Sequence, residues 1–164
     1  MCYTQKKLTG FTLIELIVTV VIVAILASVA MPVIQLNVKR AKETELRANL
    51  RQIREAIDAY KKATEEGRVK KSIEQSGYPP NLLLLVTGIE DEKDVNKKKI
   101  KFLRRIPIDP MRTRNVEKAE DKNQEWGLRS YLSAPDKPLE GEDVYDVYST
   151  STEVGINGIA YAQW

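Results

Sequence analysis

The sequence predicts an α+β fold, in which a long N-terminal membrane-spanning helix packs on a small antiparallel β-sheet head. Residues 16–34 include no charged residue, and apolar residues then recur at helical spacing as far as Tyr60. Further along, residues 126–133 and 144–149 alternate in polarity and are rich in β-forming residues. The chain has 164 residues. After the N-terminal segment roughly 100 of them remain for the head, enough for one modest core.

The uncharged run is long enough to cross a bilayer. At about 1.5 Å per residue, a helix over residues 16–34 is roughly 28 Å long, close to the thickness of the hydrocarbon core. Lys6 and Lys7 precede the run and favour a cytoplasmic N-terminus. The run is too long for a cleaved secretory signal, so a membrane anchor is the simplest interpretation. Glu15 does not fit a plain anchor, because an unpaired carboxylate in a membrane helix is costly and usually functional.

The stretch KKLTGFTLIEL, residues 6–16, resembles the leader and cleavage site of type IV prepilins and type II secretion pseudopilins. In that pattern a short basic leader ends in glycine, here Gly10, and a phenylalanine follows, here Phe11. The resemblance implies that a membrane peptidase cuts between these two residues and N-methylates Phe11. It also implies that Glu15 neutralises the new α-ammonium of a neighbouring subunit as helices pack into a filament.

The same resemblance implies a division of the chain into four parts in a type IV pilin-like fold. These are a leader at 1–10, a transmembrane assembly helix at 11–35, an amphipathic stem helix at 36–66 and a globular periplasmic head at 67–164. The chain would cross the bacterial inner membrane once. Pro32 lies late in the apolar run, where the family pattern implies a point at which the stem bends or melts; a tolerated kink is equally consistent.

The outer part of the stem has an apolar stripe. Leu46, Leu50, Ile53, Ile57 and Tyr60 are spaced by four, three, four and three residues, which places them on one helical face. We therefore expect one helix from about Thr12 to about Glu65, with this face packed against the head. The basic residues on its other side indicate a solvated surface, and no nucleic-acid partner is expected.

The head is expected to contain a short helix and two or three strands. Residues 78–86 predict a turn into a helix capped by Asn81, with residues 82–85 on the buried side. Residues 90–101 are highly charged and predict a solvated loop. Residues 133–143 contain two prolines and a glycine and predict a loop between the strands 126–133 and 144–149.

The composition argues against an enzyme. The chain has no histidine, and its single cysteine, Cys2, lies in the leader. No GxSxG motif and no glycine-rich phosphate loop occurs in the sequence. The absence of a cysteine pair also favours a pseudopilin over a type IV pilin, because many pilins close a C-terminal disulfide loop.

The major pseudopilin family places a calcium-binding loop after the last long strand, and here the corresponding stretch is STSTEVGINGIAYAQW. Calcium takes six to eight oxygen ligands, usually with several carboxylates. This stretch lacks aspartates, so no cofactor is expected. The residues that could supply oxygen ligands to a calcium ion are Asp143, Asp146, Ser149, Glu153 and Asn157. The alternative is a loop packed by its own apolar residues, Ile156, Ile159, Tyr161 and Trp164.

The expected function is that of a structural subunit of a type II secretion pseudopilus, which drives protein export across the outer membrane. The resemblance implies a homopolymer, with minor pseudopilins, the prepilin peptidase, the inner-membrane assembly platform and the membrane as partners. The alternatives are a type IV pilin for adhesion, motility or DNA uptake, and a signal-anchored periplasmic binding module that never polymerises.

The charge distribution suggests how subunits meet. Residues 39–71 hold eleven basic and six acidic residues, whereas residues 120–164 hold three basic and nine acidic ones. We expect the basic stem of one subunit to face the acidic region of another. The residues expected to take part are Arg47, Arg51 and Arg54 on the stem, and Glu140, Glu142 and Asp143 on the acidic side.

The cleavage motif gives the first prediction. Mass spectrometry of the protein isolated from its host membrane should show Phe11 as the N-terminus, carrying one methyl group. Gly10→Ala should accumulate as the uncut precursor, because the peptidase site accepts only a minimal side chain. Recovery of intact Met1, or of a terminus near Ala30, would contradict the prepilin interpretation.

Overall fold

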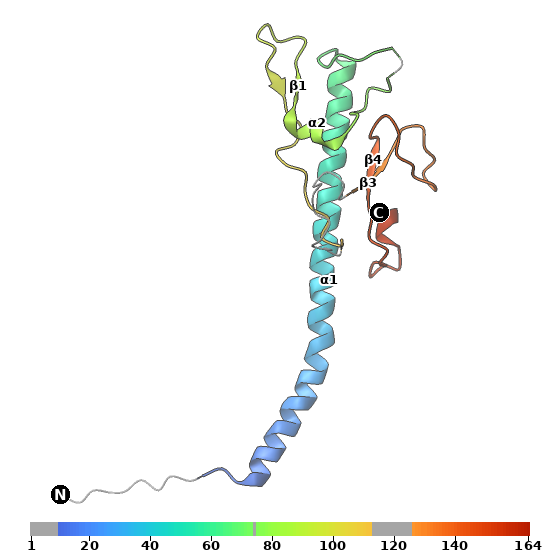
Figure 1. The fold of residues 1–164 in the computed structure, drawn as a ribbon. Helices are drawn as coiled ribbons and strands as arrows, with labels where there is room; N and C mark the ends of the chain where they lie inside the picture. Colours follow the sequence, from blue (N-terminus) through green and yellow to red (C-terminus); the bar gives the residue numbers. More distant parts are fainter. Residues whose placement is uncertain (1–9, 74, 113–125) are drawn as a thin grey trace, which may run out of the picture. The chain divides into compact units, whose positions relative to one another are not determined.

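The structure is a computed structural model that describes residues 10–73, 75–112 and 126–164. Its main element is α1, Leu13–Glu65, as the sequence predicts (Figure 1). No glycine or proline occurs between Val33 and Gly67, so nothing in this stretch breaks the helix. At its end Gly67 has φ +69°, and the amides of Gly67 and Arg68 donate to the carbonyls of Thr64 and Ala63. This pair of bonds is a Schellman motif, which satisfies the last carbonyls of the helix.

The chain forms two compact units, the first ending at Lys39 and the second comprising Arg40–Trp164. In the first unit α1 is long and apolar enough to cross a membrane, and its most apolar window is not buried by any other described part of the chain. Pro32 lies inside the helix. Two hydroxyls in the apolar run bond back to the helix: Thr19 Oγ1 donates to the Leu16 carbonyl at 2.9 Å, and Ser28 Oγ to the Ile25 carbonyl at 2.7 Å. Their polar atoms are therefore satisfied without a partner helix.

The core of the second unit lies along α1. The five residues of the predicted stripe are all at most 5 % exposed, which confirms the helical face read from the sequence. Residues from several other segments of the second unit pack against them, among them Leu85, Leu103, Trp126, Val147 and Tyr161.

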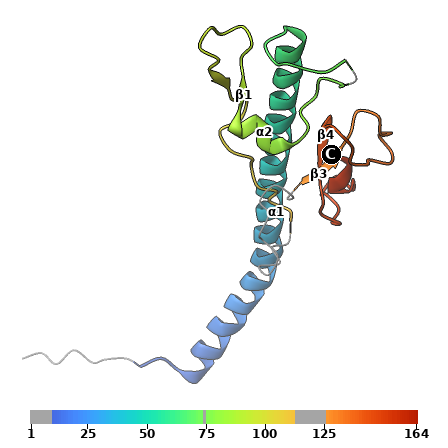
Figure 2. The same cartoon turned by 45° about the horizontal axis from the view of Figure 1, so that its top comes forward.

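In the part of the chain that the structure describes, four strands and two short helices accompany α1 in the second unit. The helix α2 is Leu82–Thr87, and the Asn81 side chain caps it by accepting from the Leu84 amide at 2.9 Å, as predicted. The strands β1 (Ile89–Glu90) and β2 (Lys99–Ile100) form one antiparallel pair, and β3 (Trp126–Arg129) and β4 (Asp146–Ser149) form another. A 3₁₀ turn, η2, follows at Tyr161–Gln163. In Figure 2, β1 lies to one side of α1, α2 crosses over α1 in this view, and β3 and β4 lie on the other side.

The prediction of a solvated loop or frayed extension at residues 90–101 is confirmed only for the middle of the stretch. Residues 92–98 form a mostly exposed loop, whereas Glu90 pairs with Lys99, and Ile89 with Ile100, on either side of it. Strands of two residues are too short to show alternation in a sequence. The hairpin is fixed at its base, where the Arg68 guanidinium bonds Asp91 at 2.7 and 3.0 Å, and the Asp91 amide donates to the Lys98 carbonyl. The hydrogen bond from Arg68 lowers the pKa of Asp91, so the carboxylate stays charged at neutral pH.

Two leucines of α2 provide a matched test of the core. Leu85 is fully buried, whereas Leu83, two residues earlier, is 43 % exposed. We expect Leu85→Ala to lower the free energy of unfolding by about 2–5 kcal/mol, because it leaves a cavity against α1. Leu83→Ala should cost much less. Thermal unfolding of the full chain in detergent, followed by tryptophan fluorescence, would measure both. Equal losses would show that α2 is not packed as described.

Candidate functional site

The start of α1 forms a closed hydrogen-bonded cap around Glu15. Glu15 Oε2 accepts from the Thr12 amide at 3.1 Å and from Thr12 Oγ1 at 2.9 Å. In return Thr12 Oγ1 accepts from the Glu15 amide at 3.3 Å. This arrangement is a capping box, which satisfies backbone donors at a helix N-terminus. The sequence signal for it, Thr-x-x-Glu before an apolar run, is present at residues 12–15.

The residues around the expected cut are accessible. Phe11 is 85 % exposed, and a Cβ added to Gly10 would meet no atom within 4 Å. Among the described residues, therefore, no contact requires glycine at position 10. The leader residues Lys6, Lys7 and Cys2 lie outside the described residues.

The calcium candidates do not come together. Asp143 accepts from Ser130 Oγ and the Tyr131 amide, and Asp146 accepts from two arginines, Arg54 and Arg129. The Ser149 hydroxyl, which is fully buried, donates to Asp109 at 2.6 Å. Asn157 Oδ1 accepts from the Ile159 amide in its own turn. Among residues 10–73, 75–112 and 126–164, no three acidic, cysteine or histidine side chains form a group suited to a metal ion.

The C-terminal segment 150–164 is instead fastened to α1 by side chains, beginning with Glu43. Glu43 is only 7 % exposed, and its Oε1 accepts from the Ile156 amide at 2.7 Å and from the Tyr161 hydroxyl at 2.9 Å. Burial, together with the hydrogen bond to Glu43, raises the pKa of Tyr161 to about 12. The phenol therefore remains a donor at any physiological pH.

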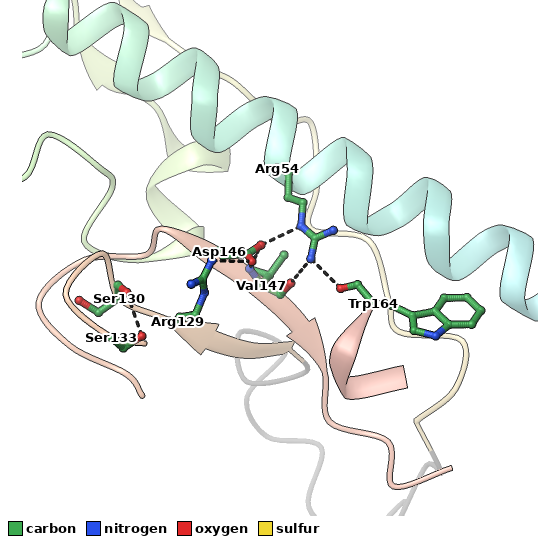
Figure 3. Close-up of polar contacts among 7 residues, drawn as sticks. All are labelled: Arg54, Arg129, Ser130, Ser133, Asp146, Val147 and Trp164. Atoms are coloured by element: carbon green, nitrogen blue, oxygen red, sulfur yellow. Dashed lines mark hydrogen bonds and ion pairs between the residues drawn. The ribbon is translucent and has the colours of Figure 1, made fainter. Parts of the chain in front are cut away.

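Arg54 is the second anchor, and Figure 3 shows its contacts. Its Nε donates to Asp146 at 2.7 Å, and its Nη2 donates to the carbonyls of Val147 at 3.1 Å and Trp164 at 2.8 Å. One guanidinium thus joins α1 to β4 and to the segment that follows η2. Arg129 also reaches Asp146, at 3.1 Å, so this carboxylate lies between two cations. Charge-assisted bonds of this kind are stronger than neutral ones.

Trp164 completes the attachment. Its ring lies 4.3 Å from the Arg47 guanidinium carbon and 5.0 Å from the Tyr161 ring in an edge-to-face arrangement. Of the four apolar residues expected to pack this loop, Tyr161 is fully buried and Trp164 packs against the core. Ile156 and Ile159 are more than 40 % exposed. The groups that donate hydrogen bonds around the segment are thus mainly a guanidinium and backbone amides. A calcium ion needs oxygen ligands, so these groups do not fit it.

Sequence reasoning missed Thr12, Glu43 and the role of Arg54. Glu43 stands three residues before Leu46, so it extends the apolar stripe by one helical step. A carboxylate on the buried face of a helix is the signal that could have identified it. Arg54 has no such signal, because its partners are more than 90 residues away in the sequence.

Comparison with known proteins assigns the chain to a class. Residues 6–31 match the model of the prokaryotic N-terminal methylation motif, so the chain is prepilin-like. It is 30 % identical over 112 residues to type II secretion system core protein G of Pseudomonas aeruginosa, covering 65 % of this chain and 70 % of that protein. It is 32 % identical over 109 residues to the core protein G of Vibrio cholerae serotype O1, covering 65 % and 67 %. No solved structure matches it significantly.

The chain belongs to the family of type II secretion system core protein G, the major pseudopilins. Members of this family are structural subunits of the pseudopilus and not enzymes, as the composition predicts. This assignment favours the secretion pseudopilin over the two alternatives, a type IV pilin and a binding module that never polymerises. The apolar helix and the methylation motif are consistent with anchoring in the inner membrane.

The attachment of the C-terminal segment by side chains leads to a prediction about metal. Calcium or a chelator should leave the thermal midpoint of the full chain in detergent unchanged. Glu43→Ala should lower the free energy of unfolding by about 1–3 kcal/mol, because two donors lose their acceptor. The control is Glu45→Ala, which removes an exposed carboxylate from the same helix and should be nearly neutral. A chelator that destabilised the wild type would contradict this description.

Proposed function

We propose that this chain is the major subunit of a type II secretion pseudopilus. The filament extends from the bacterial inner membrane into the periplasm and moves folded proteins toward the outer membrane. One observation carries the proposal: the motif of residues 10–15 opens a helix of membrane-spanning length in a chain of the core protein G family. The proposal includes cleavage after Gly10 and methylation of Phe11 by a prepilin peptidase.

The partners follow from this role. Before assembly the uncut chain meets the peptidase in the membrane, and the processed chain then meets an inner-membrane assembly platform. The filament is a homopolymer of this chain, and minor pseudopilins start it or lie at its tip. The second unit, Arg40–Trp164, is the part that lies in the periplasm.

Glu15 has two tasks in this proposal, one before and one after assembly. In the single chain, both hydrogen bonds from Thr12 go to Oε2, and no described residue bonds Oε1. These bonds reduce the cost of placing the carboxylate near the membrane but do not cancel its charge. A carboxylate accepts about four hydrogen bonds, so Oε1 can receive the α-ammonium of Phe11 from a neighbouring subunit. Pairing two buried opposite charges then fixes the axial register of the helices.

Two variants separate these tasks. Glu15→Val removes both the cap and the charge, so it should insert normally into the membrane and give few filaments. Thr12→Val removes the capping hydroxyl and keeps the charge, so filament yield should stay close to that of the wild type. Sheared-filament yield and membrane fractionation would measure the two effects. Normal filaments from Glu15→Val would refute the pairing. Equal losses of filament yield in both variants would show that Glu15 acts only as a helix cap.

A further inference from the structure

We propose that the loop between β3 and β4 of one subunit docks into a groove beside α1 on a second copy of this chain. The loop comprises residues 130–145, and the groove lies between α1 and the C-terminal segment 150–164. The inference rests on the proposed filament and specifies one contact within it. It is argued from the charge and the apolar surface that the two elements present.

The groove has an apolar floor and a basic rim. It is open, encloses about 550 Å³, and is lined by Leu50, Ile159 and Trp164 together with Arg47 and Arg51. Arg51 is exposed, and no hydrogen bond or ion pair joins it to another described residue. Arg47 lies over the Trp164 ring and keeps its charge at the groove. The acidic residues Glu55 and Asp58 also line the groove, further along α1, so its basic end is the end nearer the N-terminus of the helix.

The loop presents the complementary features. Three apolar side chains on it are exposed: Tyr131 at 56 %, Leu132 at 92 % and Leu139 at 58 %. Three carboxylates accompany them and are also exposed: Asp136, Glu140 and Glu142. Apolar residues scattered singly on a surface are normal, but three on one loop beside three carboxylates match a groove that is apolar below and basic at its rim.

The loop is held in one conformation before it meets a partner. Asp143 accepts from Ser130 Oγ at 2.8 Å and from the Tyr131 amide at 2.9 Å, and the Ser130 amide donates to the Leu139 carbonyl at 3.0 Å. The Ser133 hydroxyl bonds the Ser130 carbonyl at 3.0 Å. Tyr131 also stacks on Tyr78, with ring centroids 5.7 Å apart. A loop ordered in advance loses little conformational entropy on docking, which favours association.

Intrachain contacts narrow the set of residues that can meet between subunits. Of the six charged residues expected from the sequence to pair across subunits, Arg54 and Asp143 are engaged inside the chain. The other four of these six residues are exposed: Arg47 and Arg51 at the groove, and Glu140 and Glu142 on the loop. Figures 1 and 2 both show the loop extending away from α1, where it can reach another molecule.

The two surfaces differ from each other, which determines the kind of assembly they give. A contact between two different patches is heterologous, and when its rotation does not close, it propagates as an open helical filament. Each subunit offers one loop and one groove, so the contact can repeat without limit. The geometry therefore favours a second copy of this chain over an unrelated partner.

Cysteine cross-linking of the full chain in its host membrane tests this contact. Cys2 is the only cysteine and lies in the leader, so the processed wild type has no thiol of its own. We expect Arg51→Cys with Glu140→Cys in one chain to give a ladder of dimers, trimers and larger species with a short bismaleimide. Each single variant should give no cross-linked dimer, because a heterologous contact brings the two different positions together and keeps like positions apart. The matched control is Arg51→Cys with Val95→Cys, whose second site is 98 % exposed on a different loop and should give no ladder.

Charge reversal provides the second arm. Arg51→Glu should reduce filament yield, and adding Glu140→Lys to the same chain should restore a large part of it. Lys42→Glu makes the same change in charge on an exposed residue of α1 outside the groove and should leave the yield unchanged.

Filaments that form normally without any ladder would overturn the docking and leave the pseudopilus function intact. Cross-linked dimers in a single variant would indicate a symmetric contact between like positions and would also overturn it. If the wild type forms no filament, the proposed function itself fails.

Discussion

The buried face of α1 is the constraint on which the second unit depends. Its two sheets have two strands each, and isolated two-stranded pairs are at best marginally stable in water. Among the described residues no second layer of sheet covers either pair. Ile89 of the first pair, and Trp126 and Val147 of the second, pack in the core that includes the apolar stripe of α1. The same helix supplies the membrane segment, which means that one continuous element serves as anchor and as the spine of the core. A break in α1 would therefore affect anchoring and folding together.

The C-terminal segment is held to α1 by side chains of the helix. Glu43 accepts a backbone amide and a phenol, Arg54 donates to two carbonyls and a carboxylate, and Arg47 lies over Trp164. Both carboxylates in this set, Glu43 and Asp146, already accept hydrogen bonds from groups of the chain itself. The segment that the family resemblance associates with calcium is thus attached by hydrogen bonds and one stacked arginine.

The sequence predicts the parts of this fold whose signals are long or chemically specific. The helix of α1, its buried stripe, the Asn81 cap and the strands at β3 and β4 were predicted because periodicity and capping act over neighbouring residues. The cleavage motif was identified because its order and spacing must coincide. The β1–β2 pair was missed because strands of two residues have no period. Arg54 was placed on a solvated face, and only folding brings Asp146 and Trp164 beside it. Glu43 was detectable in principle, as a carboxylate in register with an apolar stripe.

The number of residues between α1 and the C-terminal segment that it contacts determines when the second unit can form. Glu43 and Tyr161 are 118 residues apart, and Arg54 and Trp164 are 110 apart. At typical elongation rates, synthesis of that interval takes roughly 5–20 s. During that time the outer part of α1 has left the ribosome while its apolar face has nothing to cover it. Contacts between residues so far apart in the sequence also form slowly. Newly made chains therefore pass through a state in which the apolar face of the stem is uncovered, and chaperones and proteases can recognise this state before any subunit joins a filament.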